Sequence, residues 1–398
     1  MKNLLLVALT TFFISCSTQK NKQNEVEQLP INIEKLTPIN FSAFFEEITY
    51  IPLESNDPYW IGDVDRLQVS QGNVYILSSK RVFCFNAQTG KGLFEIANLG
   101  MGPGEYKSVY DMYVDEKHET IELLDMNGQK VQKYNKEGHF MEEFSIPFQS
   151  FAFHKINNTD YFFYNNNMPS ELTDSKLIVY DSSIGKIKTQ HFPIDKHLSS
   201  YFFLVEGNNF SWTKDGVSFF SCPSSTIYNI DPSSFEVSEK YVMDFGKHQV
   251  PTEFYQENYN DIFDFSQKAI KHEYIYFVNN FGENDNYIAI SFRLDKDNYL
   301  SIYSKTDKKT ITGKAFKDDT HFNDTSFSLE YYNFPFAIDN EKLYFLMQPE
   351  QILSASTAKG AELPFKNSIK PLNEQSNPIL VVCKFKSQTS FTKEREKE

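Results

Sequence analysis

The chain has 398 residues, of which 40% are hydrophobic, so it is long enough for two average domains or one large domain with a sizeable core. Its 53 acidic residues outnumber 39 basic ones, which leaves a formal charge of −14 at pH 7, and no Lys/Arg-rich tract occurs, so we expect no nucleic-acid partner. The 38 Phe and 23 Tyr residues favour β-strands over helices.

Residues 1–15 are predicted to be an export signal. The basic start is Lys2, and the apolar run that follows is too short for a membrane-spanning helix of about 20 residues. The run ends in Phe13-Ile14-Ser15-Cys16, which resembles a bacterial lipobox. The resemblance implies cleavage before Cys16 and lipid on that cysteine, which would make the membrane a partner. An ordinary cleaved signal, with Cys16 incidental, is the alternative.

Residues 16–44 are predicted to carry the lipid and to form a polar tether, residues 45–390 to form the folded domain, and residues 391–398 to form a polar tail. An odd number of cysteines follows Cys16, which argues against a disulfide framework in an exported chain. Each of them lies in or at the end of a β-patterned run, so we expect small buried side chains. They are Cys84, Cys222 and Cys383.

A four-stranded unit occurs twice in succession within residues 60–146. The first copy has β-patterned runs at 64–69, 74–77, 81–85 and 92–96, and the second has them at 109–114, 120–125, 130–134 and 139–146. We name the strands of a unit A to D from the inside outward. Strand B recurs at 161–164, 217–220, 287–290 and 343–346, but strand D recurs only at 186–194, 236–245 and 310–316.

The start of the chain is predicted to supply the missing outer strand. The last unit ends with a C strand at 379–385, beyond which only the polar tail remains, while the β-patterned run 48–53 belongs to no unit. Pairing these two runs closes a ring and removes two exposed sheet edges. Pro52 cannot donate a hydrogen bond to a neighbouring strand, so it fits an outermost strand.

The chain is therefore predicted to be all-β, a six-bladed β-propeller of four-stranded antiparallel blades whose ring is closed by an N-terminal strand. A pair of β-sandwiches would need a linker between its halves, and a β-helix would show shorter and more regular repeats. The predicted blades are residues 60–96, 106–146, 149–194, 209–245, 272–316, and 331–386 plus 48–53.

Two segments resemble a known family. The segment Gly100-Met101-Gly102-Pro103-Gly104-Glu105-Tyr106 follows the first unit, and Tyr50-Ile51-Pro52-Leu53-Glu54 precedes it. Together they resemble the six-bladed β-propeller lipoproteins of Gram-negative bacteria, which are relatives of the NHL and TolB-type propellers. The resemblance covers roughly residues 45–386, and it implies this fold and a lipid-anchored location in the cell envelope, at the outer membrane. It implies no particular substrate.

The lengths of the connections indicate which face of the ring binds a ligand. The A–B and C–D loops emerge on one face and are short, whereas every long connection is a B–C or D–A loop, and these emerge on the other face. Long loops on a rigid scaffold usually carry function, so we expect the ligand on the B–C and D–A face. Within the connection 246–271 we expect a short helix, since Pro251 fits a helix start and the aromatic residues from Tyr255 to Phe263 have helical spacing.

The candidate ligand-binding residues lie at the top of the inner strands, just above strand B, or beside the connection 246–271. Aromatic faces combined with hydrogen-bonding groups suit sugars, peptides or other polar ligands. The candidates are Arg66, Tyr106, Tyr110, Asn209, His248, His272, Arg293 and Gln348. Taken singly, each also fits an ordinary structural or solvated role.

No motif indicates catalysis, a metal or a cofactor. The glycines of 100–104 lack the following helix that a phosphate-binding loop needs, so they indicate a turn. Asp63-x-Asp65 and Asp295-x-Asp297 lack full calcium-loop spacing, so turn residues are the better interpretation and a calcium site has no support. We therefore predict no catalytic residue, no metal ligand and no cofactor.

The predicted function is binding of a ligand or protein partner, without catalysis, by a membrane-anchored extracytoplasmic propeller. The ligand would be a saccharide or a peptide, and the protein partner another component of the envelope. Two alternatives stay open. One is a metal-dependent hydrolase or lactonase at the mouth of the central channel, an activity that some related propellers have. The other is a structural subunit of an envelope complex.

Overall fold

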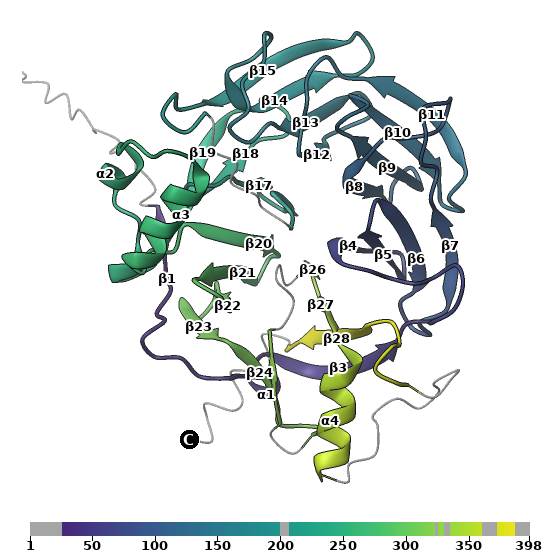
Figure 1. Cartoon of the computed structure of the whole chain (residues 1–398), viewed down its shortest axis with the longest axis vertical. Helices are drawn as coiled ribbons and strands as arrows, with labels where there is room; N and C mark the ends of the chain where they lie inside the picture. The colour runs from purple at the N-terminus through teal and green to yellow at the C-terminus, as the bar shows by residue number, and fades with distance from the viewer. Residues whose placement is uncertain (1–25, 200–206, 323–324, 330–334, 360–371, 387–398) are drawn as a thin grey trace, which may run out of the picture.

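β-Sheets surround a central axis in the computed structural model of the chain, as Figure 1 shows. The innermost strands of neighbouring sheets line that axis, and the outer strands form the rim. The structure describes residues 26–199, 207–322, 325–329, 335–359 and 372–386, without the side chains of 356–359.

Consecutive strands build the first three sheets. Each is four-stranded and antiparallel, with its strands in chain order from the axis outward. Their strands are β4 (Val64–Ser70), β5 (Asn73–Ser78), β6 (Arg81–Asn86), β7 (Gly92–Ile96), β8 (Val109–Asp115), β9 (Thr120–Asp125), β10 (Lys130–Asn135), β11 (Phe140–Ser145), β12 (Ala152–Lys155), β13 (Asp160–Tyr164), β14 (Ser175–Asp181) and β15 (Lys186–Pro193).

The next two sheets repeat this plan, and all six predicted B strands form. The fourth sheet has β16 (Phe210–Thr213), β17 (Gly216–Phe220), β18 (Thr226–Ile230) and β19 (Val237–Asp244). The fifth has β20 (Phe277–Glu283), β21 (Tyr287–Leu294), β22 (Asp297–Ser304) and β23 (Lys309–Gly313).

The ring closes as the sequence predicts. A sheet of β26 (Phe336–Ile338), β27 (Lys342–Met347) and β28 (Ile379–Phe385) takes its outermost strand from the start of the chain, β3 (Phe45–Pro52). Strands β28 and β3 are antiparallel, with Ile379 opposite Pro52 and Val382 opposite Thr49. Strand β3 lies at the edge of the sheet, which is where Pro52, having no backbone N–H to donate, is tolerated.

The prediction of six blades is wrong, because the chain forms seven sheets. The seventh is three-stranded and joins β2 (Ile39–Asn40), β24 (Ala315–Asp318) and β25 (Thr325–Ser328). Counted as a blade, it makes the propeller seven-bladed. The predicted single D strand at 310–316 is in fact two strands, β23 and β24, which separate after Gly313. A Cβ atom at Gly313 would lie 2.5 Å from the carbonyl oxygen of Thr37, so a glycine lets the N-terminal segment pass close by.

The N-terminal segment is bound to the rim within the range predicted as a tether, 16–44. Strand β1 (Glu27–Pro30) pairs in parallel with β19, and β2 pairs in parallel with β24. Helix α1 (Phe41–Phe44) then leads into β3. Leu29 is 0% exposed and belongs to the core beside Met243. Apolar side chains spaced along an otherwise polar stretch thus bind the segment to three sheets. Residues 16–25 of the predicted tether lie outside the described ranges.

Helices occur in two of the long connections. The connection between β19 and β20 holds the 3₁₀ helix η1 (Gly246–His248), α2 (Thr252–Tyr255) and α3 (Ile262–Lys271), and α4 (Pro349–Lys359) lies between β27 and β28. The predicted short helix forms as two helices: α2 begins after Pro251 and ends at Tyr255, and α3 begins only at Ile262, so the helical spacing from Tyr255 to Phe263 does not mark one continuous helix. Asp261 caps α3 by accepting a hydrogen bond from the backbone N–H of Asp264 at 2.8 Å. In the described part of the chain no helix has the length and apolar character needed to cross a membrane.

The hydrophobic core fills the spaces between neighbouring sheets. Aromatic rings dominate it: Tyr287 of β21 stacks on Phe385 of β28 with 4.3 Å between ring centroids. Cys84, Cys222 and Cys383 are buried and free, which confirms their predicted role as small buried side chains. Cys16 lies outside the described residues.

Candidate ligand-binding site on the propeller axis

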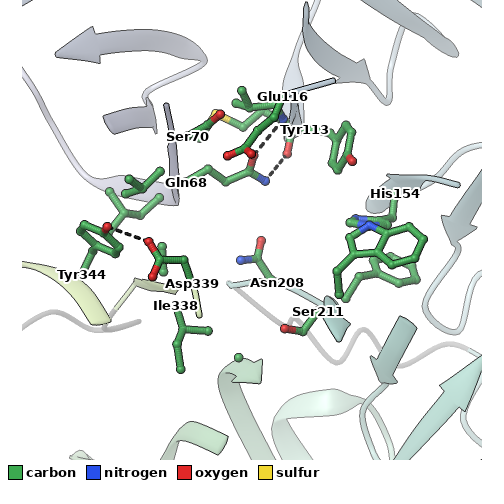
Figure 2. A pocket seen from close by; sticks show the side chains of 18 of the residues that line it. Gln68, Ser70, Tyr113, Glu116, His154, Asn208, Ser211, Ile338, Asp339 and Tyr344 are labelled. Atoms are coloured by element: carbon green, nitrogen blue, oxygen red, sulfur yellow. Dashed lines mark hydrogen bonds between the residues drawn. The ribbon is translucent and has the colours of Figure 1, made fainter. Parts of the chain in front are cut away.

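A cavity of about 460 Å³ lies on the axis, at the end where the inner strands finish. Its size is within the ~300–1,000 Å³ range of small-molecule sites. Figure 2 shows its walls. They come from β4, β8, β12, β16, β20, β26 and β27, from the turns that follow β8 and β26, and from the two residues before β16. The lining side chains used below are those of Gln68, Tyr113, Glu116, His154, Asn208 and Trp212, together with Asp339.

Side chains join the inner strands to each other and so make the walls rigid. Gln68 of β4 donates from Nε2 to the carbonyl oxygen of Met112 (2.7 Å) and accepts from the N–H of Val114 (3.0 Å) on β8. Ser211 of β16 makes the same double contact with Glu283 of β20, at 2.8 and 3.0 Å. In both cases, backbone N–H and C=O groups at the free edge of one inner strand form hydrogen bonds with a side chain of the neighbouring inner strand.

An ion pair continues this ring of bridges. Arg66 of β4 donates from Nε to Oδ1 of Asp111 on β8 at 2.9 Å, and both side chains are buried. Oδ2 of Asp111 accepts the backbone N–H of Phe153 on β12 at 3.0 Å. Burial raises the pKa of Asp111, and Arg66 opposes that rise. The pair therefore holds three sheets in register beside the cavity.

One wall of the cavity is aromatic. His154 of β12 lies edge-on to Tyr113 (4.8 Å between centroids), stacks on Phe210 (5.4 Å) and tilts against Trp212 (5.6 Å). Burial lowers the pKa of His154 to about 3, so the ring is neutral at physiological pH. Trp212 is 41% exposed, which leaves a large part of its indole uncovered on this wall.

The opposite wall carries polar groups (Figure 2). Asp339, in the turn after β26, accepts at Oδ2 from the hydroxyl of Tyr344 (2.7 Å) and at Oδ1 from the N–H groups of Glu341 and Lys342. Asn208 lies between the two walls, and its side-chain amide makes no hydrogen bond within the described ranges. It is thus a free donor and acceptor pointing at the cavity.

A second carboxylate at the rim of the cavity is neutralised by its neighbours. Asp115, at the end of β8, contacts Lys155 Nζ at 2.8 Å and His118 Nδ1 at 2.7 Å. Burial raises its pKa, but hydrogen bonds from Lys155 and His118 outweigh this and lower it. Lys155 also pairs with buried Glu122 at 2.7 Å, so this cluster is an internal link between β8, β9 and β12.

Two of the eight predicted residues lie at the cavity or in its wall. Asn209 lines it, although its Nδ2 is engaged by the carbonyl oxygen of Phe220 at 2.9 Å. Arg66 lies behind the lining and positions Asp111. Both side chains therefore help to hold the wall of the cavity in place.

The other six predicted residues do not line the cavity. Tyr106 is fully buried, with its hydroxyl on the carbonyl oxygen of Ile96, and Tyr110 packs on the ring of Phe151. His248 lies in η1 and contacts Glu34, whereas His272 follows α3 and stacks on a tyrosine. Arg293 belongs to β21, and Gln348 lies between β27 and α4.

The cavity is at the opposite end of the axis from the face that loop lengths indicated. Its lining includes turn residues of A–B connections, such as Glu116 and Asn340. Much of the predicted long-loop face falls on 200–206, 330–334 and 360–371, which are outside the described residues. One signal in the sequence could have indicated the cavity: Trp212, one of two tryptophans in the chain, lies on an inner strand.

A metal site finds no candidate ligands here. Within the described ranges, no group of three or more His, Cys, Asp or Glu side chains is placed to hold a metal ion. The hydrolase alternative therefore has no observation in its favour.

Comparisons with known proteins give the family of the chain and support its fold. A family model described as a domain of unknown function, DUF4934, matches residues 26–384. A Bacteroides fragilis protein that is provisionally described as exported is similar in structure, with a TM-score of 0.69, 18% identity, and coverage of 90% of this chain and 100% of that one. A Bacteroides vulgatus protein of the DUF4221 family gives a TM-score of 0.52 at 11% identity, over 86% and 97% of the two chains. A search of curated proteins finds no significant match. At these identities the structural likeness supports the propeller fold.

Proposed function

We propose a function for this chain, which belongs to the family described as a domain of unknown function, DUF4934: it is an exported, lipid-anchored propeller that binds a small polar ligand in its axial cavity without transforming it. The observation that carries the proposal is the cavity itself. It combines an uncovered aromatic ring, Trp212, with a free amide, Asn208, and with walls held rigid by side-chain bridges such as Gln68. In a preformed site of this kind, ordering of the side chains costs little free energy when a ligand binds.

Three of the four carboxylates in the cavity lining support binding over catalysis, the fourth being Glu116. A general acid or base needs a proton that it exchanges with the ligand. Asp111 is paired with Arg66, Asp115 is paired with Lys155, and Asp339 accepts three hydrogen bonds from its own surroundings. These carboxylates are engaged in holding the wall together.

Anchoring is proposed through lipid on Cys16. The first strand, β1, begins at Glu27, so ten residues separate it from the cysteine. At up to ~3.5 Å per residue, that segment lets the propeller stand close to the membrane surface. Replacement Cys16→Ser is expected to move the protein from the membrane fraction to the soluble fraction after cell disruption, and unchanged membrane retention contradicts the proposal.

A structural role in an envelope complex is a second candidate, favoured by one residue. Phe263, on α3 in the long connection between β19 and β20, is 75% exposed on a helix whose other aromatic neighbours pack inward. An uncovered ring of this size on the long-loop face suits a protein partner. Phe263→Ser should lose any protein that co-purifies with the wild-type chain from membranes, whereas a cavity variant should keep it.

The test of ligand binding uses two matched substitutions. Asn208→Phe places a ring in the cavity, and Asn258→Phe places the same ring on the exposed loop between α2 and α3. Both proteins, with the wild type, are screened by thermal shift against neutral sugars, short peptides, amino acids and nucleosides, and each compound that raises Tm is followed by calorimetry. Binding should persist in Asn258→Phe and disappear in Asn208→Phe. A compound bound equally by both variants contradicts a ligand site on the axis, as does turnover of the bound compound.

A further inference from the structure

The charges around the axial cavity disfavour an anionic ligand. Of the charged side chains in its lining, Asp111 and Asp115 are compensated by Arg66 and Lys155 behind the wall. The remaining lining charges are those of Glu116, Asp339 and Lys117, two negative and one positive. A phosphate, sulfate or carboxylate ligand would thus enter a slightly negative site with no arginine directed at it.

The same charges do not build a cation site. Asp339 already accepts three hydrogen bonds, from the Tyr344 hydroxyl at 2.7 Å and from two backbone N–H groups, which leaves about one of its four lone-pair sites for a ligand. Lys117 lines the same cavity, and its positive charge would repel a cationic ligand. In the aromatic wall Trp212 is 41% exposed and Tyr113 is half-buried, while His154 and Phe210 are buried, so the wall is not a cage of several exposed rings around a point. A neutral ligand is the best electrostatic match.

The arrangement of surfaces then specifies the shape of that ligand. The uncovered part of Trp212 is a flat apolar platform, while Asn208 and Asp339 offer hydrogen-bonding groups away from it (Figure 2). The amide both donates and accepts, and Asp339 retains acceptor capacity because a carboxylate has about four lone-pair sites. A sugar ring has this division, with C–H groups on its face and hydroxyls, which donate and accept, around its edge.

We propose that the axial cavity binds an uncharged saccharide, with one ring on the indole of Trp212 and its hydroxyls on Asn208 and Asp339. This inference rests on the proposed function and names the class of its ligand. Gln68 and Ser211 act as positioning residues, because their hydrogen bonds join β4 to β8 and β16 to β20.

The chain provides its own reporter for a test. It has two tryptophans, Trp60 and Trp212, and Trp60 precedes β4 outside the cavity lining. The variant Trp60→Phe, made in the full chain, leaves Trp212 as the single fluorophore. It is titrated with glucose and N-acetylglucosamine as neutral probes, glucuronate as the anionic match, glucosamine as the cationic match, and the disaccharides maltose, cellobiose and lactose.

The expected result is a saturable change in Trp212 emission with at least one neutral sugar and a weaker response to glucuronate. Calorimetry with that sugar should show affinity lower by about tenfold in Trp212→Ala and in Asn208→Ala, with Asn258→Ala unchanged. An unchanged circular dichroism spectrum and Tm in each variant confirm that loss of binding is not loss of fold.

The other outcomes separate the two proposals. If glucosamine or a peptide binds in the cavity and every neutral sugar fails, the inference of an uncharged saccharide is overturned and the ligand site stands. Equal sugar affinity in wild type and Trp212→Ala also overturns the inference. If no compound of any class distinguishes Asn208→Phe from Asn258→Phe, the ligand site itself is overturned.

Discussion

Asp318 connects the seventh sheet to the strand that closes the ring. It lies at the end of β24, and its Oδ2 accepts the hydroxyl of Tyr50 on β3 at 2.6 Å. Its Oδ1 accepts the N–H groups of Thr320 and His321 at 2.9 and 2.7 Å. Burial raises the pKa of Asp318, but hydrogen bonds from His321 and Tyr50 outweigh this and hold it well below the ordinary range. Asp318 in turn raises the pKa of His321.

Asp318→Asn is predicted to lower the free energy of unfolding by about 1–3 kcal/mol, since buried donors lose a charged acceptor. The lowered pKa of Asp318 means that its contribution is present above about pH 4 and is lost as the pH falls. The raised pKa of His321 means that its contribution is present below about pH 6.5 and is lost as the pH rises.

The difference in free energy of unfolding between the wild type and Asp318→Asn should therefore be largest between about pH 4 and 6.5. Urea unfolding at about pH 3, 5 and 8 measures it, with Asp215→Asn, on an exposed turn, as the matched control. A gap of equal size at all three pH values would show that the Asp318 carboxylate is not the group responsible.

The N-terminal segment is the element that holds neighbouring sheets together at the rim. Strand β1 pairs with β19, and Glu27 also contacts Lys308, in the turn between β22 and β23 of the next sheet, at 2.6 Å. Further on, β2 pairs with β24 and β3 with β28. The segment thus joins the sheets that contain β19, β24 and β28, and its apolar side chains should contribute to stability in proportion to their burial.

Leu29→Ala in β1 is predicted to destabilise the protein by about 2–5 kcal/mol, because the side chain is 0% exposed and its loss leaves a cavity beside Met243. Gln28→Ala, one position earlier and exposed, is the control and should change stability by less than about 0.5 kcal/mol. Equilibrium unfolding in urea measures both. Equal stability of the two variants would mean that β1 is not part of the cooperative fold.

Strand lengths explain which elements the sequence could predict. The B strands were predictable because short runs rich in Val, Ile, Leu, Phe and Tyr recur along the chain. The C strands that follow them end in an aromatic or apolar residue before a turn residue, as at Phe85-Asn86 and Tyr134-Asn135. Strand β2 has two residues, and its pairing with β24 depends on a partner almost 280 positions away. No local pattern specifies such a contact, and the β23–β24 break was hidden inside one continuous β-patterned run.

At the scale of the whole molecule, closure of the ring was predictable, but the end of the axis that holds the cavity was not. Closure follows from counting: a surplus strand at 48–53 and a missing one after 379–385. The cavity depends on which inner side chains bridge neighbouring strands and which leave space. Arg66 and Tyr106, chosen for the channel mouth, are used for structure, whereas Asn208 and Trp212 face open space.

A disulfide between β3 and β28 should lock the ring. Thr49 and Val382 are opposite each other, so the variant Thr49→Cys/Val382→Cys is expected to oxidise and to raise the free energy of unfolding by about 2–4 kcal/mol by linking distant parts of the unfolded chain. Unfolding of the same variant under reducing conditions is the control. Failure of the two thiols to react, seen by mass spectrometry, would mean that the register of the closing strands is different.

The central claim is that the ligand lies on the axis, between Trp212 and Asp339, and not on the face with the long loops. A crystal structure of the protein soaked with the compound that raises Tm most would test this directly. The account predicts electron density for that compound in the axial cavity, in contact with Trp212 and Asn208. Density for it among the loops at 195–207, 246–271 or 348–376, with the axial cavity free of it, would contradict this prediction.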